Sequence, residues 1–147
     1  MDDWGAWLTL AHMGATWAMV GLIWFVQIVH YRLFEAVPDD AFCEYEQAHC
    51  RLTAWVVGPP MLVEAGTAVA MAFAPPAGTS HELLWIGLAL VAFIWAVTYG
   101  VQVPAHRRLS ESADLAARRQ LVRGNWWRTA AWSARGLVAG ALVAQQM

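Results

Sequence analysis

Four side chains that suit metal chemistry lie near the ends of apolar segments in this sequence. Glu46 and His49 have the i, i+3 spacing that, in helical bundles, aims two side chains at one ion. His30 and His106 stand where two other apolar segments end, at a comparable depth by residue count. Because imidazole and carboxylate together are good ligands for zinc, iron or copper, we expect a metal site formed by these four residues.

The same histidines suit a second kind of cofactor. Two of His30, His49 and His106 could ligate a haem between helices, because axial imidazole ligands are common. A di-iron site of the bundle type would require two Glu-x-x-His motifs, and the sequence contains one. Iron, copper and haem all stay open as cofactors. The alternative for each histidine is a hydrogen-bonded residue at the membrane interface that binds no cofactor.

Three further residues are candidates for catalysis. Counting about 1.5 Å per residue, Glu64 and Arg135 each fall within roughly 2 Å of the centre of a bilayer. Either charge alone would be uncompensated there, so we expect an ion pair between them. Together with Tyr99, which lies nearer the histidines, this pair could handle protons or substrate. The competing interpretation is a structural pair that holds the helices in register.

Polar residues recur on one face of each apolar segment, at spacings that are typical of helices. His12 and His30 are 18 residues apart, which is five helical turns, and Glu46 and Glu64 have the same separation. Gln27 lies on the same face as the two histidines. The last two apolar segments each carry a polar ridge, formed by Trp95, Tyr99, Gln102 and His106 and by Asn125, Arg128, Trp132 and Arg135. We expect the four polar faces to meet inside a bundle.

Composition and segment length identify the elements that position these residues. Apolar residues make up 59% of the chain and charged residues 14%, whereas about a quarter of an ordinary soluble domain is charged. A membrane span needs about 20 mostly apolar residues. Four segments of one domain qualify, at about 7–34, 52–73, 83–103 and 126–144. We expect a short helix at the membrane interface over about 106–124.

The arginines predict the orientation of these spans. All arginines except Arg135, which falls at the centre of the membrane, lie on one side of the membrane. The other side carries Asp2, Asp3, His81 and Glu82. The positive-inside rule places the arginine side in the cytoplasm. The predicted fold is therefore an all-α integral membrane protein, an antiparallel four-helix bundle with up-down-up-down topology and both termini outside. We expect it to be multi-pass in the inner (plasma) membrane, with the lipid bilayer as a partner and no nucleic acid.

Prolines and cysteines add three local expectations. Pro59 and Pro60 each remove a backbone donor, so the second span should kink or unwind one turn before Glu64. Pro104 should end the third span just before His106. Cys43 and Cys50 would face the cytoplasm, where a disulfide does not persist, so we expect two reduced thiols.

The last third of the chain resembles known membrane proteins. Residues 103–109 (VPAHRRL) and 121–129 (LVRGNWWRT) are similar to segments of small bacterial four-span membrane proteins of unknown function. More distantly, they resemble the anthrone-oxygenase-like membrane family, in which a Val-Pro-x-Asn pattern closes span three and a segment ending in Arg-Thr opens span four. His106 stands where that family tends to have Asn. The resemblance implies a four-helix membrane fold and oxidation of a hydrophobic small molecule.

Three functions fit these observations. The first is a membrane-embedded redox or oxygenase-type protein that holds a metal or haem through its histidines and acts on a hydrophobic small molecule. The second is a small proton-coupled carrier or channel, working as a homo-oligomer, with Glu64 and Arg135 as the coupling pair. The third is a non-enzymatic membrane assembly subunit. We favour the first, as a membrane oxidoreductase.

Overall fold

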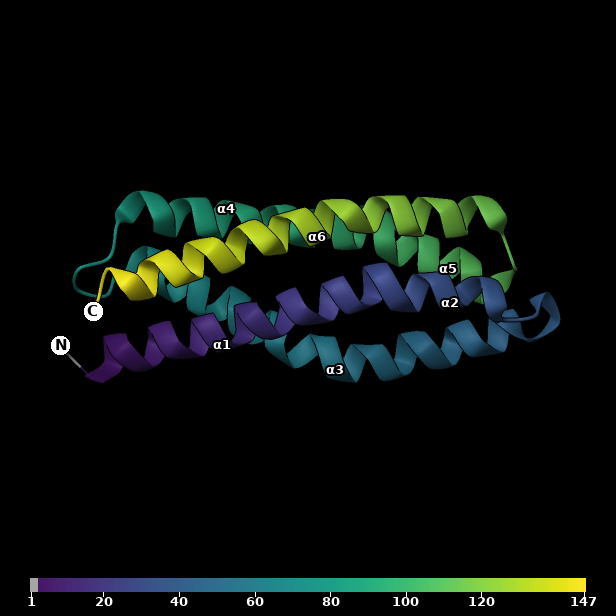
Figure 1. Ribbon diagram of the computed structural model, residues 1–147, viewed down its shortest axis with the longest axis horizontal. Helices are drawn as coiled ribbons and strands as arrows, with labels where there is room; N and C mark the ends of the chain where they lie inside the picture. The colour runs from purple at the N-terminus through teal and green to yellow at the C-terminus, as the bar shows by residue number, and fades with distance from the viewer. Residues whose placement is uncertain (1–2) are drawn as a thin grey trace.

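Four long helical rods make up the computed structural model, which describes residues 3–147 (Figure 1). No strand occurs within this range. The first rod joins α1 (Asp3–Phe25), a π-helical turn η1 (Val26–His30), α2 (Tyr31–Leu33) and η2 (Phe34–Ala36). The second is α3 (Asp39–Phe73). The third joins α4 (His81–Val97), a π-helical turn η3 (Thr98–Gln102) and α5 (Val103–Glu111), and the fourth is α6 (Leu115–Ala144).

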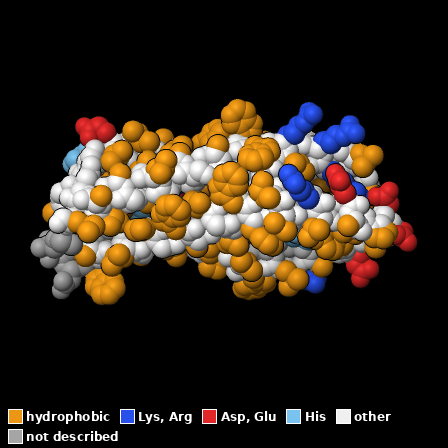
Figure 2. All heavy atoms as spheres, viewed as in Figure 1, with side chains coloured by type: hydrophobic (Ala, Val, Ile, Leu, Met, Phe, Trp, Pro, Cys, Tyr) orange, Lys and Arg blue, Asp and Glu red, His pale blue; other side chains and the backbone are white. Residues whose placement is uncertain are grey.

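Three of these rods are long and apolar enough to cross a membrane. Within the described residues they are Trp4–Ala36, Asp39–Phe73 and His81–Glu111. The fourth predicted span, in α6, is less apolar than these three because it contains Arg128 and Arg135. Both of these side chains are buried against the other rods. Large apolar side chains cover much of the outside, and blue arginine side chains are confined to one half of the face shown in Figure 2.

The third and fourth rods each begin after a residue whose side chain caps the first turn of the helix. Ser80 accepts a hydrogen bond from the Leu83 amide at 3.3 Å at the start of α4. Asp114 accepts bonds from the amides of Ala116 and Ala117 at the start of α6. Figure 1 shows that α1 begins and α6 ends at the same end of the structure.

The predicted interfacial helix over 106–124 is wrong. Residues 106–111 continue the third rod as α5, and residues 115–124 already belong to α6, with only 112–114 between them. Pro104 does not end the third span. It lies in the first turn of α5, directly after η3, where the Val103 amide bonds to the Thr98 carbonyl in the wider π pattern. A proline is tolerated at the first turn of a helix because its missing donor is not needed there.

Pro59 and Pro60 lie inside α3 without unwinding it, because the helix is continuous from Asp39 to Phe73. Figure 1 shows α3 changing direction near its middle. Local unwinding is therefore not found, and a bend in the helix accommodates the two missing backbone donors.

Three apolar clusters alternate with polar layers along the bundle. The cluster near the chain ends contains Leu8, Met71, Leu84 and Leu142. The middle cluster contains Met19, Ile23, Met61, Ile94 and Trp132, and the third is built around Phe34, Phe42, Leu109 and Leu121. The polar layers between these clusters contain the candidate site residues other than Tyr99.

Candidate functional site

The central polar layer is organised around Glu64 on α3 and Arg135 on α6. Arg135 Nε donates to Glu64 Oε1 at 2.6 Å, and both side chains are almost wholly buried. Trp132 Nε1 donates to the other carboxylate oxygen at 2.9 Å. The ion pair expected from the depth of these two residues is therefore confirmed.

The rest of the Arg135 guanidinium is also hydrogen-bonded. Nη1 donates to the backbone carbonyl of Gly87 on α4, and Nη2 lies 3.2 Å from Nε2 of His12 on α1. A guanidinium only donates, so His12 Nε2 accepts and its Nδ1 carries the proton. That Nδ1–H then donates to Thr67 Oγ1 at 2.8 Å, and Thr67 donates to the Val63 carbonyl.

The central layer is thus a closed network. Both oxygens of Glu64 and all three nitrogens of Arg135 have partners, which come from all four rods. A buried ionic group in which every nitrogen and oxygen has at least one partner holds helices in register. The geometry of this layer supports the structural interpretation of the pair.

Amide side chains form a second layer nearer the histidines. Arg128 Nη1 donates to Asn125 Oδ1 at 3.2 Å, Asn125 Nδ2 donates to Gln27 Oε1 at 2.9 Å, and Gln27 Nε2 donates to the Val122 carbonyl. Gln102 accepts from the Tyr31 hydroxyl at 3.3 Å and donates to the Leu121 carbonyl. Asn125, which the sequence placed on the polar ridge of the fourth segment, has its side chain in this amide layer.

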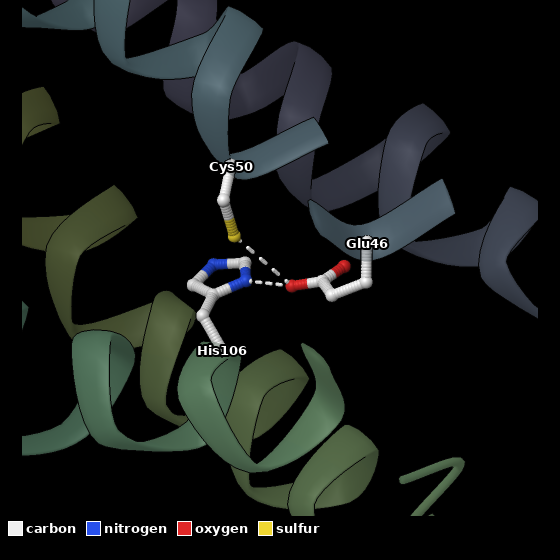
Figure 3. Close-up of side chains that lie close together, drawn as sticks. All are labelled: Glu46, Cys50 and His106. Carbon is white, nitrogen blue, oxygen red and sulfur yellow. Dashed lines mark hydrogen bonds and ion pairs between the residues drawn. The ribbon is translucent and has the colours of Figure 1, made fainter. Parts of the chain in front are cut away.

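The histidine layer brings three possible metal ligands together (Figure 3). Glu46 and Cys50 are one turn apart on α3, and His106 reaches toward them from α5. His106 Nδ1 is in hydrogen-bond contact with Glu46 Oε1, and Cys50 Sγ lies 3.4 Å from the same oxygen. One ligand atom from each residue lies within 4.8 Å of the other two. Ligands that bind one zinc ion at about 2.0–2.3 Å require a cluster of this size.

The second oxygen of Glu46 has no partner. Glu46 is fully buried, and its Oε2 atom makes no hydrogen bond. An unpaired buried carboxylate oxygen is costly, because it has lost its water without gaining another donor or cation. The central layer has no such atom on Glu64 or Arg135. This contrast marks the Glu46 cluster, rather than the Glu64 pair, as the place where a bound cation would be stabilised.

His49 and His30 extend the cluster as a stack of rings. The rings of His30 and His49 lie 4.3 Å apart between centroids, and His49 is 5.6 Å from His106. His49 Nδ1 lies 3.1 Å from Thr53 Oγ1. The expected metal site of four residues is found only in part, because Glu46 and His106 belong to the group of close ligand atoms and His30 and His49 do not. His30 packs between His49 and Phe34, and its Nε2 is buried without a partner.

The stacked rings do not suit a haem held by His30 and His49. Axial imidazoles bind iron from opposite faces of the porphyrin, so the macrocycle must fit between the two rings. The two rings already contact one another face to face, with an interplanar angle of 23°. His30 and His49 therefore do not fit a haem as its two axial ligands.

Two π-helical turns flank these residues. η1 spans Val26–His30 and so contains Gln27 and His30, and η3 spans Thr98–Gln102, one turn before His106. π turns in otherwise α-helical rods are rare and occur frequently at functional sites. Here each of them brings a glutamine into the amide layer.

Tyr99 lies away from these layers. Its side chain is 62% exposed and packs on Trp95, whereas Gln102 is buried. The expected ridge assumed α-helical spacing, in which residues three apart share a face. The wider η3 turn rotates less per residue, so Tyr99 and Gln102 no longer point the same way. The expectation that Tyr99 faces the interior is therefore wrong.

A cavity of about 400 Å³ adjoins the histidine layer. His49, Cys50 and His106 line it at one side, and apolar side chains from α1 and α3 line most of the remainder, among them Met19, Ile23, Val57 and Met61. Two other lining residues, Ala54 and Val103, are exposed on the outside of the bundle. Small-molecule pockets typically measure roughly 300–1,000 Å³ and are mostly apolar, so this cavity could admit a ligand from the bilayer.

Sequence reasoning missed two members of this site. Cys50 is four residues after Glu46 and therefore lies on the same face of α3, a spacing that could have indicated its role. Arg128 was placed on a polar ridge but received no function, although it lines the cavity. Its position beside an open space could not be read from spacing alone.

Comparison of the chain with known protein families, curated proteins and solved structures finds no match. The resemblance of residues 103–109 and 121–129 to the anthrone-oxygenase-like family therefore stays a prediction. The functional argument depends on the residues of the site itself.

Proposed function

We propose that this protein is a membrane-embedded metalloprotein that binds one transition-metal ion through Glu46, Cys50 and His106 and acts on a hydrophobic small molecule in the adjoining cavity. The observation that carries the proposal is the fully buried carboxylate of Glu46, whose Oε1 atom lies beside a thiol and an imidazole and whose Oε2 atom has no partner. His49 is the candidate for a fourth ligand.

The donor set narrows the choice of ion. Thiolate and imidazole suit zinc, iron and copper, whereas magnesium and calcium prefer oxygen ligands alone. With iron or copper, the ion would supply redox chemistry at the wall of an apolar cavity, which is the oxidoreductase function that we favour. The protein would hold the ion, exclude water and orient the hydrophobic molecule.

The proposed membrane arrangement has four spans, with α6 as the fourth. Its two interrupting charges, Arg128 and Arg135, are buried within the bundle, which reduces their cost in a bilayer. With the arginine-rich end in the cytoplasm, both termini would be outside, the topology up-down-up-down and the metal site near the cytoplasmic face.

Metal analysis of the purified protein tests the proposal. The protein in lipid nanodiscs is incubated separately with zinc, iron(II) and copper(I), desalted and measured by elemental mass spectrometry. We expect a single ion per chain in the wild type and loss of that ion in Glu46→Gln, Cys50→Ser and His106→Gln. Cys43→Ser is the matched control, because this thiol is not part of the cluster.

Two results would contradict the proposal. The first is a wild-type protein that retains no ion under any of the three conditions. The second is retention of the ion by the Cys50→Ser and His106→Gln variants, provided that both elute and melt like the wild type.

The two alternative functions have less support from the geometry. A carrier that uses Glu64 and Arg135 requires a group that can exchange partners, but every polar side-chain atom of this pair already has a partner, and the pair does not line the cavity. An assembly subunit without a ligand leaves the unpaired oxygen of Glu46 without an explanation.

A further inference from the structure

Arg128 on α6 is a buried cation without a carboxylate partner. Its side chain is 9% exposed, and no Asp or Glu within residues 3–147 forms an ion pair with it. Its Nη1 atom donates to the neutral oxygen of Asn125, and its Nε atom is buried with no hydrogen-bond partner. The guanidinium lies 5.0 Å from the ring of Trp132.

The comparison with Arg135, seven residues later on the same helix, shows what Arg128 lacks. Arg135 has a carboxylate, a carbonyl and an imidazole as partners. A buried charge that is not compensated is strongly destabilising. The ring of Trp132 and the oxygen of Asn125 compensate Arg128 only in part, because neither carries a negative charge.

Arg128 lines the 400 Å³ cavity together with the apolar side chains of α1 and α3. A ligand that matches both features has an apolar chain and an anionic head. A carboxylate in the cavity would complete the charge balance of Arg128 through the part of the guanidinium that lines it. A two-chain phospholipid is too large for a cavity of this volume, whereas a single acyl chain of medium length is not.

We propose that the cavity binds a medium-chain fatty acid, with its carboxylate on Arg128 and its acyl chain along the apolar wall formed by Ile23, Val57 and Met61. The inference rests on the proposed function, because it names the class of hydrophobic molecule that occupies the same cavity.

Direct binding to the protein in nanodiscs tests this assignment. Radiolabelled dodecanoate is titrated onto the metal-free protein, with empty nanodiscs as the baseline, and dodecan-1-ol and dodecyl phosphate are titrated in parallel. We expect saturable binding of dodecanoate and roughly tenfold or greater weakening for the alcohol, because the alcohol loses a charge-assisted bond. Dodecyl phosphate should bind more weakly than dodecanoate, since its head is bulkier.

Three variants assign the binding to the cavity. Arg128→Gln should weaken dodecanoate binding roughly tenfold or more, while Arg128→Lys keeps part of it. Arg123→Gln is the matched control, because Arg123 is an exposed arginine on the same helix that does not line the cavity. Val57→Phe fills the apolar wall and should abolish binding while Arg128 is still present, so the test survives if Arg128→Gln fails to fold.

Several outcomes would overturn the assignment. Two of them are equal affinity for the acid and the alcohol, and unchanged binding of dodecanoate in Val57→Phe. A third is tighter binding of dodecyl phosphate, which would assign Arg128 to a phosphate head instead. Metal binding without dodecanoate binding overturns this inference alone. Dodecanoate binding by a protein that retains no metal supports it and contradicts the metal proposal, so the two failures are distinguishable.

Discussion

Arg135 Nε lies 2.6 Å from Glu64 Oε1 at the middle of the bundle, and neither side chain is more than 2% exposed. This pair joins α3 to α6, and the same guanidinium also contacts α1 and α4 through His12 and Gly87. One arginine therefore connects all four rods. Its role follows from geometry, because a fully partnered buried pair favours a unique register of the helices.

Removal of one partner from this pair should destabilise the protein strongly. Glu64→Gln leaves Arg135 as an uncompensated buried charge, so we expect the free energy of unfolding to fall by about 3–5 kcal/mol. Denaturant titration in nanodiscs measures the change. Glu111→Gln is the matched control, because Glu111 pairs with Arg107 at an exposed site and should lose less than about 1 kcal/mol. Wild-type stability in Glu64→Gln would contradict the structural role.

Gly124 should be required where α6 approaches η3. A Cβ atom at this position would lie 2.8 Å from both Gln102 Nε2 and Val101 Cγ1, and Gln102 is held by two hydrogen bonds. We therefore expect Gly124→Ala to cost about 1–3 kcal/mol of stability. Gly140→Ala on the same helix meets nothing within 4 Å and should be neutral or slightly stabilising, because alanine favours helix. Equal melting temperatures of the two variants would argue against close packing here.

Metal affinity should decrease as the pH falls. A metal ligand must be deprotonated, so protons compete with the ion for the imidazole of His106 and the thiol of Cys50. Competition with a chromophoric chelator at several pH values measures this dependence. His49→Gln should weaken binding if His49 is the fourth ligand, and it should leave the direction of the pH dependence unchanged. An affinity that is independent of pH would contradict ligation by these groups.

Cysteine labelling should determine the membrane orientation. In a background with Cys43→Ser and Cys50→Ser, Ser112→Cys lies in the connection between α5 and α6, and Thr79→Cys lies in the connection between α3 and α4. With the arginine-rich end inside, a membrane-impermeant maleimide added to intact cells should label only Thr79→Cys. The reverse pattern, or labelling of both sites, would contradict the proposed topology.

Several features of the structure could be predicted because they depend on residues that are close in sequence. Hydrophobic length located the rods, and helical periodicity placed Glu46, Glu64 and Gln27 on buried faces. The depth of Glu64 and Arg135 in their segments was enough to predict their ion pair, since two opposite charges at one level of a small bundle have few other partners. His49 and His106 were also correctly placed near one another.

Other features depended on how the rods pack. Tyr99 points outward instead of inward because η3 is a π turn, and the spacing of residues does not predict such a turn. The expected interfacial helix is divided between α5 and α6, because Asp114 provides an N-cap and the chain turns within three residues. Asn125 bonds to Gln27 on another rod, and the spacing of residues along α6 does not identify this partner.

The amino-acid sequence by itself determined that the chain forms long apolar helices with polar faces, because length and periodicity are properties of single segments. Only the tertiary structure decided which of those polar groups are satisfied. Every polar side-chain atom of Glu64 and Arg135 has a partner, whereas Glu46 Oε2 and Arg128 Nε have none. The physical reason is that a hydrogen bond between helices depends on the distance and angle between two atoms on different rods, and the spacing of residues along one rod does not contain either quantity.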